Sequence, residues 1–324
     1  MKLLIRRKNK YPEFSIKQYA EKRNRILFIR QVGGLGDIFM HCMMFEDIKN
    51  LHSDLAIVWA LPKVYCCVGK MHKYVDEVIN VEEVDPSQYV IFYNTTNACR
   101  NYEVKLAPRA DKHRSDIWAN HCGVYLKNHR LNLELPKENL ENGQKILNQI
   151  NLRGRRSILI APVSSTSMKD LTDEHLEAIS VYARRHNFCL IGSHTSSIMK
   201  FRDLGVPVVH GLSIPDWMGL IHAVDYVISV DTAAVHYAGA IGKPTVGVFS
   251  YVDGKVYGKY NPKFVLVQKH RDNGDWNCGP CYNWGACPKE TGLVKPCITE
   301  ISAKMLICGI NNMIEKYPPN TILI

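Results

Sequence analysis

Three short segments carry residues whose types and spacing could bind or transfer a charged group. The first is the glycine turn Gly33, Gly34, Leu35, Gly36, followed at once by Asp37. Glycines let a backbone bend sharply and approach a ligand, and a carboxylate at a helix start can accept a proton or cap the helix. The turn lacks the Gly-x-Gly-x-x-Gly pattern and the following Lys-Ser/Thr pair, which excludes a dinucleotide fingerprint and a P-loop.

The second segment, SVDTAAVHYAGAIGKP, joins a predicted strand to a predicted helix. The strand is expected to end at Asp231 and the helix to begin over Thr232 and Ala233. Unpaired N–H groups and the positive end of the helix dipole suit a diphosphate there, and His236, one turn inside the helix, could reach the same phosphate. Asp231 or Thr232 could instead only cap the helix, and His236 could be a core histidine.

The third segment is a serine-rich loop after the predicted strand SILIAP. Ser164, Thr166 and their serine neighbours are followed by Lys169. Hydroxyls and an ammonium group suit a phosphate or a leaving group that gains negative charge, although such a loop can equally be only a loop. Gly192 ends a further predicted strand, FCLIGS, and is expected at the same edge of the sheet.

The elements that must position these segments alternate between strand and helix. Strands are predicted at 26–31, near 56 and near 91, and again from 157, 188, 207, 226 and 245. Helices are predicted at 37–49, 173–185, 217–222, from 232, and at 299–316. Such alternation is typical of parallel sheets covered by helices, and ligands bind at the carboxyl ends of the strands. The polar segments above therefore follow strands where a binding cleft is expected.

Length and composition are those of a two-domain globular chain. The 324 residues are 46% hydrophobic and 22% charged, and the formal net charge of +10 favours anionic partners. We predict a basic extension at 1–24, a first domain at 25–152, and a second at 153–324 that ends in a closing helix. No apolar run reaches the ~20 residues of a membrane span, so a cytoplasmic location in a bacterium or a virus-infected bacterial cell is expected.

Four of the eleven cysteines are clustered near the carboxyl terminus. Cys278, Cys281, Cys287 and Cys297 have the spacing C-x2-C-x5-C-x9-C. Four thiolates can hold zinc or iron in a tetrahedral site, and such a site would be structural because it has no open position. Free thiols and disulfides remain the alternatives.

Taken together, VGGLGDIFM, APVSSTSMKDLT and ISVDTAAVHYAGAIGKPTVGVFS resemble the lipopolysaccharide heptosyltransferase family, glycosyltransferase family 9. The four-cysteine segment is also similar to one found in many relatives. The resemblance implies an α/β fold of the GT-B type, with two Rossmann-like parallel-sheet domains facing a central cleft. It also implies a nucleotide-diphosphate sugar held mainly by the second domain and an acceptor facing the first.

The resemblance further implies roles for single residues. Asp37 corresponds to the proposed general base, on the acceptor side with its glycine turn, and Lys169 to the lysine after the serine loop. Asp231, Thr232 and His236 correspond to donor-binding positions, where Ala233 replaces a frequent glycine. The chain has no Asp-x-Asp pair, the usual metal–diphosphate grip of other sugar transferases, so no catalytic metal is expected.

Three functions are compatible with these residues. The first is an inverting glycosyltransferase acting on a bacterial glycan such as lipopolysaccharide core. The second is the same chemistry on a hydroxylated base in DNA, favoured by the basic extension and by a basic run at Arg109, Lys112, His113 and Arg114. The third is a non-catalytic nucleotide-sugar binding protein, which the intact Asp37, Lys169 and His236 disfavour. The basic extension could also contact an anionic membrane surface.

Overall fold

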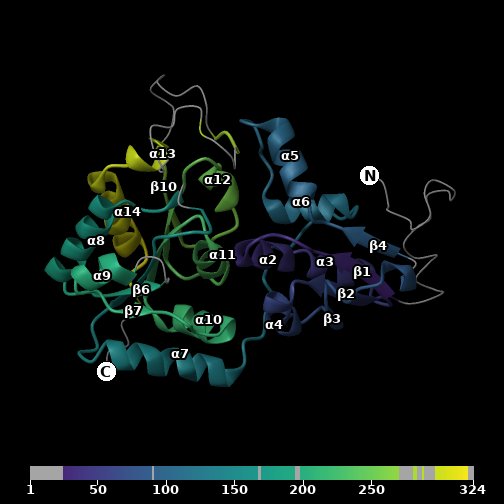
Figure 1. Ribbon diagram of the computed structural model, residues 1–324, viewed down its shortest axis with the longest axis horizontal. Helices are drawn as coiled ribbons and strands as arrows, with labels where there is room; N and C mark the ends of the chain where they lie inside the picture. The colour runs from purple at the N-terminus through teal and green to yellow at the C-terminus, as the bar shows by residue number, and fades with distance from the viewer. Residues whose placement is uncertain are drawn as a thin grey trace. The chain divides into compact units, whose positions relative to one another are not determined.

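The described part of the chain forms two compact units. A computed structural model describes residues 25–89, 91–166, 169–193, 198–269, 280–282, 287 and 296–319. The first unit takes its described residues from Met1–Lys105 and Lys112–Glu134, and the second from Leu106–Asp111 and Leu135–Ile324 (Figure 1). Within the described ranges, no helix combines the length and the apolar character needed to cross a membrane.

The first unit is built on a four-stranded parallel sheet with the strand order β3-β2-β1-β4. The strands are β1 (Arg25–Ile29), β2 (Ala56–Leu61), β3 (Glu77–Asn80) and β4 (Ile91–Asn94). The helices are α2 (Leu35–Cys42), α3 (Phe45–Leu51), α4 (Cys66–Lys70), α5 (Ala98–Leu106) and α6 (Arg114–His121), and 3₁₀ turns lie at η1 (Lys63–Tyr65) and η2 (Pro86–Gln88). The central strands β1 and β2 are apolar and almost wholly buried, as strands covered on both faces must be.

Strand pairing brings the segments after β1 and β4 together. The two strands are parallel, with Ile29 opposite Asn94, so both end at the same edge of the sheet. Arg30, which follows β1, donates from Nη1 to the carbonyl oxygen of Thr96 at 2.8 Å. Below this edge, His41 of α2 stacks on Trp59 of β2 with ring centroids 5.2 Å apart. Helix α2 is therefore fixed to the sheet directly behind the glycine turn.

The second unit is built on a six-stranded parallel sheet with the order β10-β9-β8-β5-β6-β7. The strands are β5 (Ser157–Ala161), β6 (Cys189–Ser193), β7 (Val208–Val209), β8 (Tyr226–Val230), β9 (Thr245–Val248) and β10 (Phe264–Val267). The helices are α7 (Lys137–Ile150), α8 (Asp173–Arg185), α9 (Ile198–Asp203), α10 (Ile214–Ala223), α11 (Ala233–Ala240), α12 (Gly254–Tyr257), α13 (Pro296–Thr299) and α14 (Ala303–Lys316). Strand β5 lies directly beside β8, so the loop after β5 starts next to the residues that follow β8.

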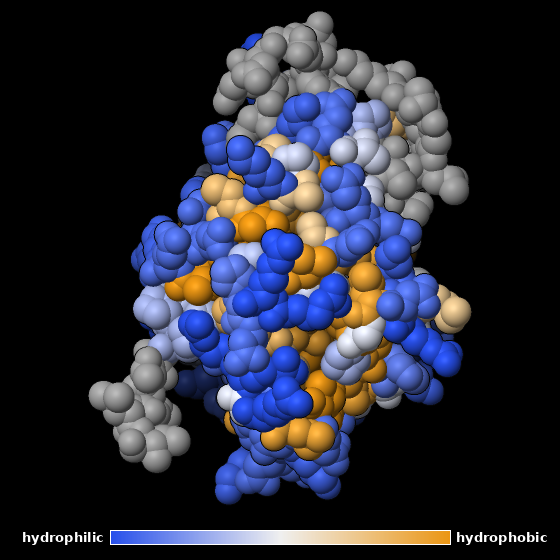
Figure 2. All heavy atoms as spheres, turned by 90° about the vertical axis from the view of Figure 1, so that its left-hand side faces the viewer, coloured by the Kyte–Doolittle hydropathy of each residue, from blue (hydrophilic) through white to orange (hydrophobic). Residues whose placement is uncertain are grey.

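Helices α8 and α14 cover one face of this second sheet. Ile228 of β8 and Val246 of β9 pack in one buried core with Leu306 and Ile310 of α14. Figure 2 shows the surface on this side, where hydrophilic side chains alternate with apolar areas, the most extended of them in the lower centre of the view. The exposed positions of α8 are charged: Asp173, Glu174, Glu177, Arg184 and Arg185. These helices are thus amphipathic, with an apolar face on the sheet and a polar face toward solvent.

The structure confirms the parallel sheets and most predicted elements, with corrections to two helices and two strands. The predicted helix 37–49 is two helices, α2 and α3, because the backbone tightens between them, where Met44 N–H donates to His41 O at 3.3 Å. The predicted helix 299–316 begins later, as α14 at Ala303, because the Ser302 hydroxyl caps it; Thr299 is the last residue of the separate short helix α13. Strands β3 and β10 were not predicted.

Helix α7 belongs to the second compact unit. The predicted boundary at 152/153 placed these residues in the first domain, whereas the longer segment of the second unit begins at Leu135. Asn139 and Asn142 of α7 donate to Asp216 of α10 at 2.7 and 3.0 Å, which ties the two helices together. The boundary between the folding domains stays a prediction.

The crossing of α7 and α10 depends on two glycines. A Cβ at Gly219 would overlap the carbonyl oxygen of Asn139, and a Cβ at Gly143 would overlap the Gly219 backbone. We expect Gly219→Ala to lower the free energy of unfolding by about 1–3 kcal/mol, the usual cost of overpacking, in urea denaturation. Lys145→Ala on the exposed face of α7 is the control. Equal stability of the two variants would contradict this reading of the crossing.

Candidate active site

In the first unit, the glycine turn brings Arg30 and Asp37 together. Gly33 has φ of +126°, a backbone conformation that side-chain-bearing residues rarely adopt. A Cβ at this position would lie 2.5 Å from Arg30 Nη2 and 2.6 Å from Asp37 Oδ2. Gly34 is the N-cap of α2, and its N–H donates to Asp37 Oδ2 at 3.2 Å. Asp37 therefore does cap the helix, and the cap leaves its carboxylate beside the turn.

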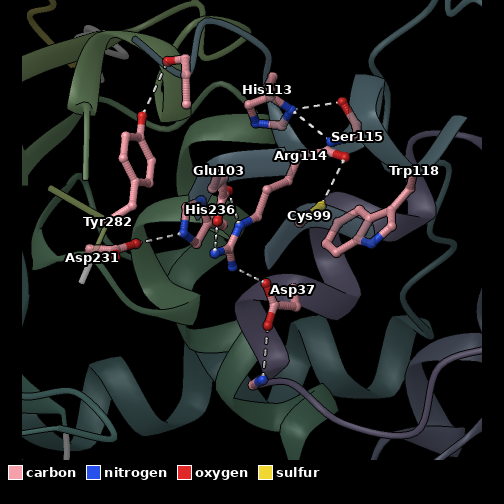
Figure 3. A network of polar contacts seen from close by, with 12 residues as sticks. Asp37, Cys99, Glu103, His113, Arg114, Ser115, Trp118, Asp231, His236 and Tyr282 are labelled. Carbon is pink, nitrogen blue, oxygen red and sulfur yellow. Dashed lines mark hydrogen bonds and ion pairs between the residues drawn. The ribbon is translucent and has the colours of Figure 1, made fainter. Parts of the chain in front are cut away.

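Two arginines contact the Asp37 carboxylate, and one of them, Arg114, is drawn in Figure 3. Arg114 Nη1 of α6 lies 2.5 Å from Asp37 Oδ1, and Arg30 Nη2 lies 3.2 Å from Asp37 Oδ2. The Asp37 side chain is 11% exposed. At that depth the two positive charges act with little screening and favour the ionised carboxylate.

A second carboxylate holds Arg114 from its other side. Glu103 of α5 accepts from Arg114 Nε and Nη2, both at 2.8 Å, in a bidentate pair. Its side chain is 1% exposed. Arg30 is fixed by Thr96 and by the ring of Trp118, whose centroid lies 4.7 Å from the guanidinium carbon. Arg114 was assigned to a basic run, but its own side chain is buried between two carboxylates.

In the second unit, Asp231 is the centre of a polar cluster after β8. Lys169 Nζ donates to Asp231 Oδ2 at 2.9 Å and to the Asp231 carbonyl oxygen at 3.1 Å. His236 Nε2 lies 3.1 Å from Asp231 Oδ1 (Figure 3). Burial opposes the charge on Asp231, but Lys169 and His236 outweigh it and hold the pKa of this carboxyl well below its usual range. Asp231 is therefore a buried anion that orients a lysine and a histidine.

Around this cluster, the serine loop is ordered by its own hydrogen bonds. The Ser164 hydroxyl donates to Thr166 O at 2.7 Å, and Ser164 N–H donates to Asp170 Oδ1 at 2.7 Å. The turn places Lys169 under the ring of Tyr251, with Nζ 5.6 Å from the centroid. Ser167 lies outside the described residues. The loop thus delivers the lysine to Asp231 while the Ser164 hydroxyl is used within the turn.

Helix α11 begins where the diphosphate site was predicted. Thr232 is its N-cap with an extended backbone, and its side chain makes no capping hydrogen bond. Ala233 starts the helix, so the first-turn N–H groups open toward the end of β8. Gly192 is different: its N–H donates to Pro207 O, and a Cβ there would lie 2.8 Å from the Phe201 ring. Packing against Phe201 accounts for this glycine, and its role in donor binding stays a prediction.

Comparison with known proteins identifies the family. The model of glycosyltransferase family 9 (heptosyltransferase) matches residues 98–278, which is more than half of the 324 residues. The chain belongs to glycosyltransferase family 9. It is therefore an enzyme that transfers a sugar from a nucleotide sugar, as the resemblance predicted. Among curated proteins, no sequence matches the chain.

Solved structures of family 9 enzymes share the fold. Escherichia coli ADP-heptose lipopolysaccharide heptosyltransferase II matches with a TM-score of 0.66 and 12% identity over 90% of this chain and 99% of that one. A family 9 enzyme from Veillonella parvula matches with a TM-score of 0.70 and 13% identity, over 91% of this chain and 98% of that one. A third match is TibC of enterotoxigenic E. coli, an iron-containing dodecameric heptosyltransferase solved with ADP-D-beta-D-heptose. Its TM-score is 0.66 and its identity is 12%, over 91% of this chain and 77% of that one. The predicted α/β fold of the GT-B type is confirmed.

For this family 9 chain, the predicted site residues are found in two clusters. Asp37 and its glycine turn, with Gly33, Gly34 and Gly36, lie in the first unit, and Lys169, Asp231 and His236 lie together in the second. Arg30 and Glu103 were missed. An arginine directly after the buried run ILFI was a usable signal for Arg30, since a charge at the end of a buried strand needs a partner. No signal in ACRNYEVKL distinguishes Glu103 from a surface glutamate.

The cysteine cluster is only partly described. Cys278 lies outside the described residues, while Cys281, Cys287 and Cys297 lie inside them. Among described side chains, no group of three or more histidine, cysteine or acidic residues is arranged to hold a metal ion. The three described cysteines therefore do not form such a site by themselves.

The Asp231 cluster should make stability depend on pH. Folding lowers the pKa of Asp231, so its carboxylate contributes fully to the free energy of unfolding above about pH 5. This contribution is lost as the pH falls below about 4, where the carboxyl of the unfolded chain becomes protonated. We expect the free energy of unfolding of Asp231→Asn to fall less steeply than wild type between about pH 5 and pH 2.5, in urea denaturation at each pH. The exposed Asp203→Asn is the control. Parallel acid limbs for wild type and Asp231→Asn would contradict the ion pairing.

Proposed function

We propose that this enzyme transfers a sugar with inversion from a nucleotide-diphosphate sugar to a hydroxyl group of a bacterial glycan such as lipopolysaccharide core. The observation that carries the proposal is the Asp37 carboxylate, held by two arginines at the start of α2. A carboxylate fixed in this way can take the proton of an acceptor hydroxyl as its oxygen attacks the anomeric carbon. Solved relatives that are named as ADP-heptose enzymes support a related donor.

The second cluster supplies what the leaving group needs. As the anomeric C–O bond breaks, the electron pair stays on the diphosphate, whose charge rises. The Lys169 ammonium and the N–H groups of Thr232 and Ala233 at the α11 start would meet this charge more strongly in the transition state than in the substrate. Asp231 would act by keeping Lys169 and His236 in place. In this scheme, Ser164 and Thr166 shape the loop of the donor site.

No catalytic metal enters the proposed reaction. The absence of an Asp-x-Asp pair in the sequence and the presence of Lys169 near the α11 N-terminus support a reaction in which protein groups neutralise the phosphates. Cys278, Cys281, Cys287 and Cys297 remain the proposed place for a structural zinc or iron ion. Their spacing and the iron-containing relative TibC support it, and no step of the transfer depends on it.

Sugar incorporation from a panel of labelled nucleotide sugars, ADP-heptose included, tests the proposal. Two acceptors are offered in parallel: a truncated lipopolysaccharide core and hydroxymethylated duplex DNA. Label in the core is expected. Label only in DNA would overturn the glycan acceptor and give the basic residues a role in phosphate contacts. If no donor gives label in either acceptor, the proposed transfer to a lipopolysaccharide core is contradicted.

A further inference from the structure

The Asp37 site is part of a buried cluster of four charged side chains. Arg30, Asp37, Glu103 and Arg114 are 5, 11, 1 and 7% exposed, and their formal charges add to zero. Three different elements and the end of β1 supply them. Burying ions is costly unless they are paired, so a neutral set of this kind is one that a fold can tolerate.

The geometry of the Arg114 guanidinium divides its donors between two carboxylates (Figure 3). Nε and Nη2 form one edge of the planar group and donate to Glu103, and Nη1 is left to reach Asp37. A bidentate pair fixes the plane of an arginine, because two parallel hydrogen bonds allow no rotation. Glu103 thereby determines where Nη1 lies, and Nη1 determines where Asp37 Oδ1 lies.

The charges of the cluster have a second consequence for Asp37. A carboxylate that faces two guanidinium groups binds a proton more weakly than one that faces a single guanidinium group, which makes it a weaker general base. Glu103 places a compensating negative charge on the far side of Arg114. The pair Glu103–Arg114 therefore presents Asp37 with a donor in a fixed position but with less than a full positive charge.

We propose that Glu103 and Arg114 are positioning residues of the transfer reaction: Arg114 aims the Asp37 carboxylate, and Glu103 both fixes Arg114 and offsets its charge so that Asp37 can accept the acceptor proton. The inference rests on the proposed role of Asp37 as the base. It adds two residues to the site that do not touch the substrate.

Three titratable groups near the cluster are neutral near pH 7. Burial raises the pKa of the Cys99 thiol of α5 well above its usual value, and burial followed by the Asp37 charge raises the pKa of Tyr65 in η1. Burial followed by the Arg30 charge lowers the pKa of His41, on the same helix as Asp37, well below its usual value. These three side chains therefore add no charge next to the four ions of the cluster.

The test is a ¹³C NMR titration of the Asp37 carboxyl in protein labelled at aspartate Cγ, with the signal assigned by its loss in Asp37→Asn. Glu103→Gln is expected to move the titration midpoint to lower pH and Arg114→Gln to higher pH, each by about one unit or more. The double variant Glu103→Gln/Arg114→Gln is expected to titrate between wild type and Arg114→Gln. Midpoints that do not follow this order would overturn the proposal.

The double variant also guards against unfolding, because it leaves neither an unpaired Glu103 nor an unpaired Arg114 in the interior. Thermal melts check that each variant is folded, and the exposed Glu82→Gln is the control that should titrate like wild type. In the transfer assay, the double variant should lower kcat about tenfold or more with the donor KM unchanged. Unchanged kcat would also count against positioning.

Failure of the proposal and failure of the base role can be told apart. If the midpoints follow the expected order but Asp37→Asn keeps full transfer activity, the charge cluster stands and Asp37 is not the base. If Asp37→Asn is inactive but the midpoints of all variants coincide, the base stands and Glu103 and Arg114 have only a structural role.

Discussion

Asp37→Asn is expected to lower kcat for sugar transfer by about 10²–10⁴-fold, the range that a general base contributes. The amide has nearly the shape of the carboxylate and can still cap α2, but it cannot take the acceptor proton. Donor binding should be unchanged, because Lys169, Asp231 and the α11 N-terminus lie in the second unit. Initial-rate kinetics and calorimetric titration with ADP-heptose separate the two effects.

A control variant and a stability measurement are needed to interpret the kcat of Asp37→Asn. Asp54→Asn changes an exposed aspartate of the same unit and should leave kcat as it is. Asp37→Asn also removes a buried charge from between Arg30 and Arg114, so its stability must be measured, and a loss of up to about 3–5 kcal/mol is expected because two arginines lose a charged partner. A folded Asp37→Asn enzyme with wild-type kcat would exclude Asp37 as the base.

The parts of the site that the sequence predicts are those made by contiguous residues. A buried strand, an aspartate, a threonine and a helix follow one another in SVDTAAVHY, and the local order of these residues already places Thr232 and Ala233 at a helix start. The glycine turn before Asp37 is read in the same way, because a strand that turns sharply into a helix needs residues free of a Cβ.

The parts that sequence does not predict are made by residues far apart in the chain. Lys169 meets Asp231 only because β5 and β8 are neighbours in the sheet, and strand order is not written in a local pattern. Arg114 shows the same limit more strongly: beside Lys112 and His113 it has the pattern of a solvated basic run, yet Glu103 and Asp37 make it a buried ion. Charge patterns report composition, whereas pairing depends on tertiary packing.

One helix end and one whole strand were missed because their local sequence gives no clear signal. Helix α2 stops at Cys42 within the continuous apolar stretch CMMF, where a helical pattern could simply continue. Strand β10 is a run of only four residues, FVLV, too short to be told from a buried loop by periodicity. In both places the tertiary packing decides the backbone.

Lys169→Met is expected to produce the second large effect, a loss of about 10²–10³-fold in kcat together with a loss of stability of about 3–5 kcal/mol. Methionine has a similar length but no charge, so the buried Asp231 carboxylate would keep only His236 as a partner.

The double variant Lys169→Met/Asp231→Asn removes both charges and should recover most of the stability, while kcat stays low because the leaving diphosphate still lacks its ammonium. The exposed Lys304→Ala, measured alongside, should change neither quantity. Recovery of kcat in the double variant would mean that Lys169 serves only to neutralise Asp231, since a group that stabilises the leaving charge cannot be replaced by removing its own counter-ion.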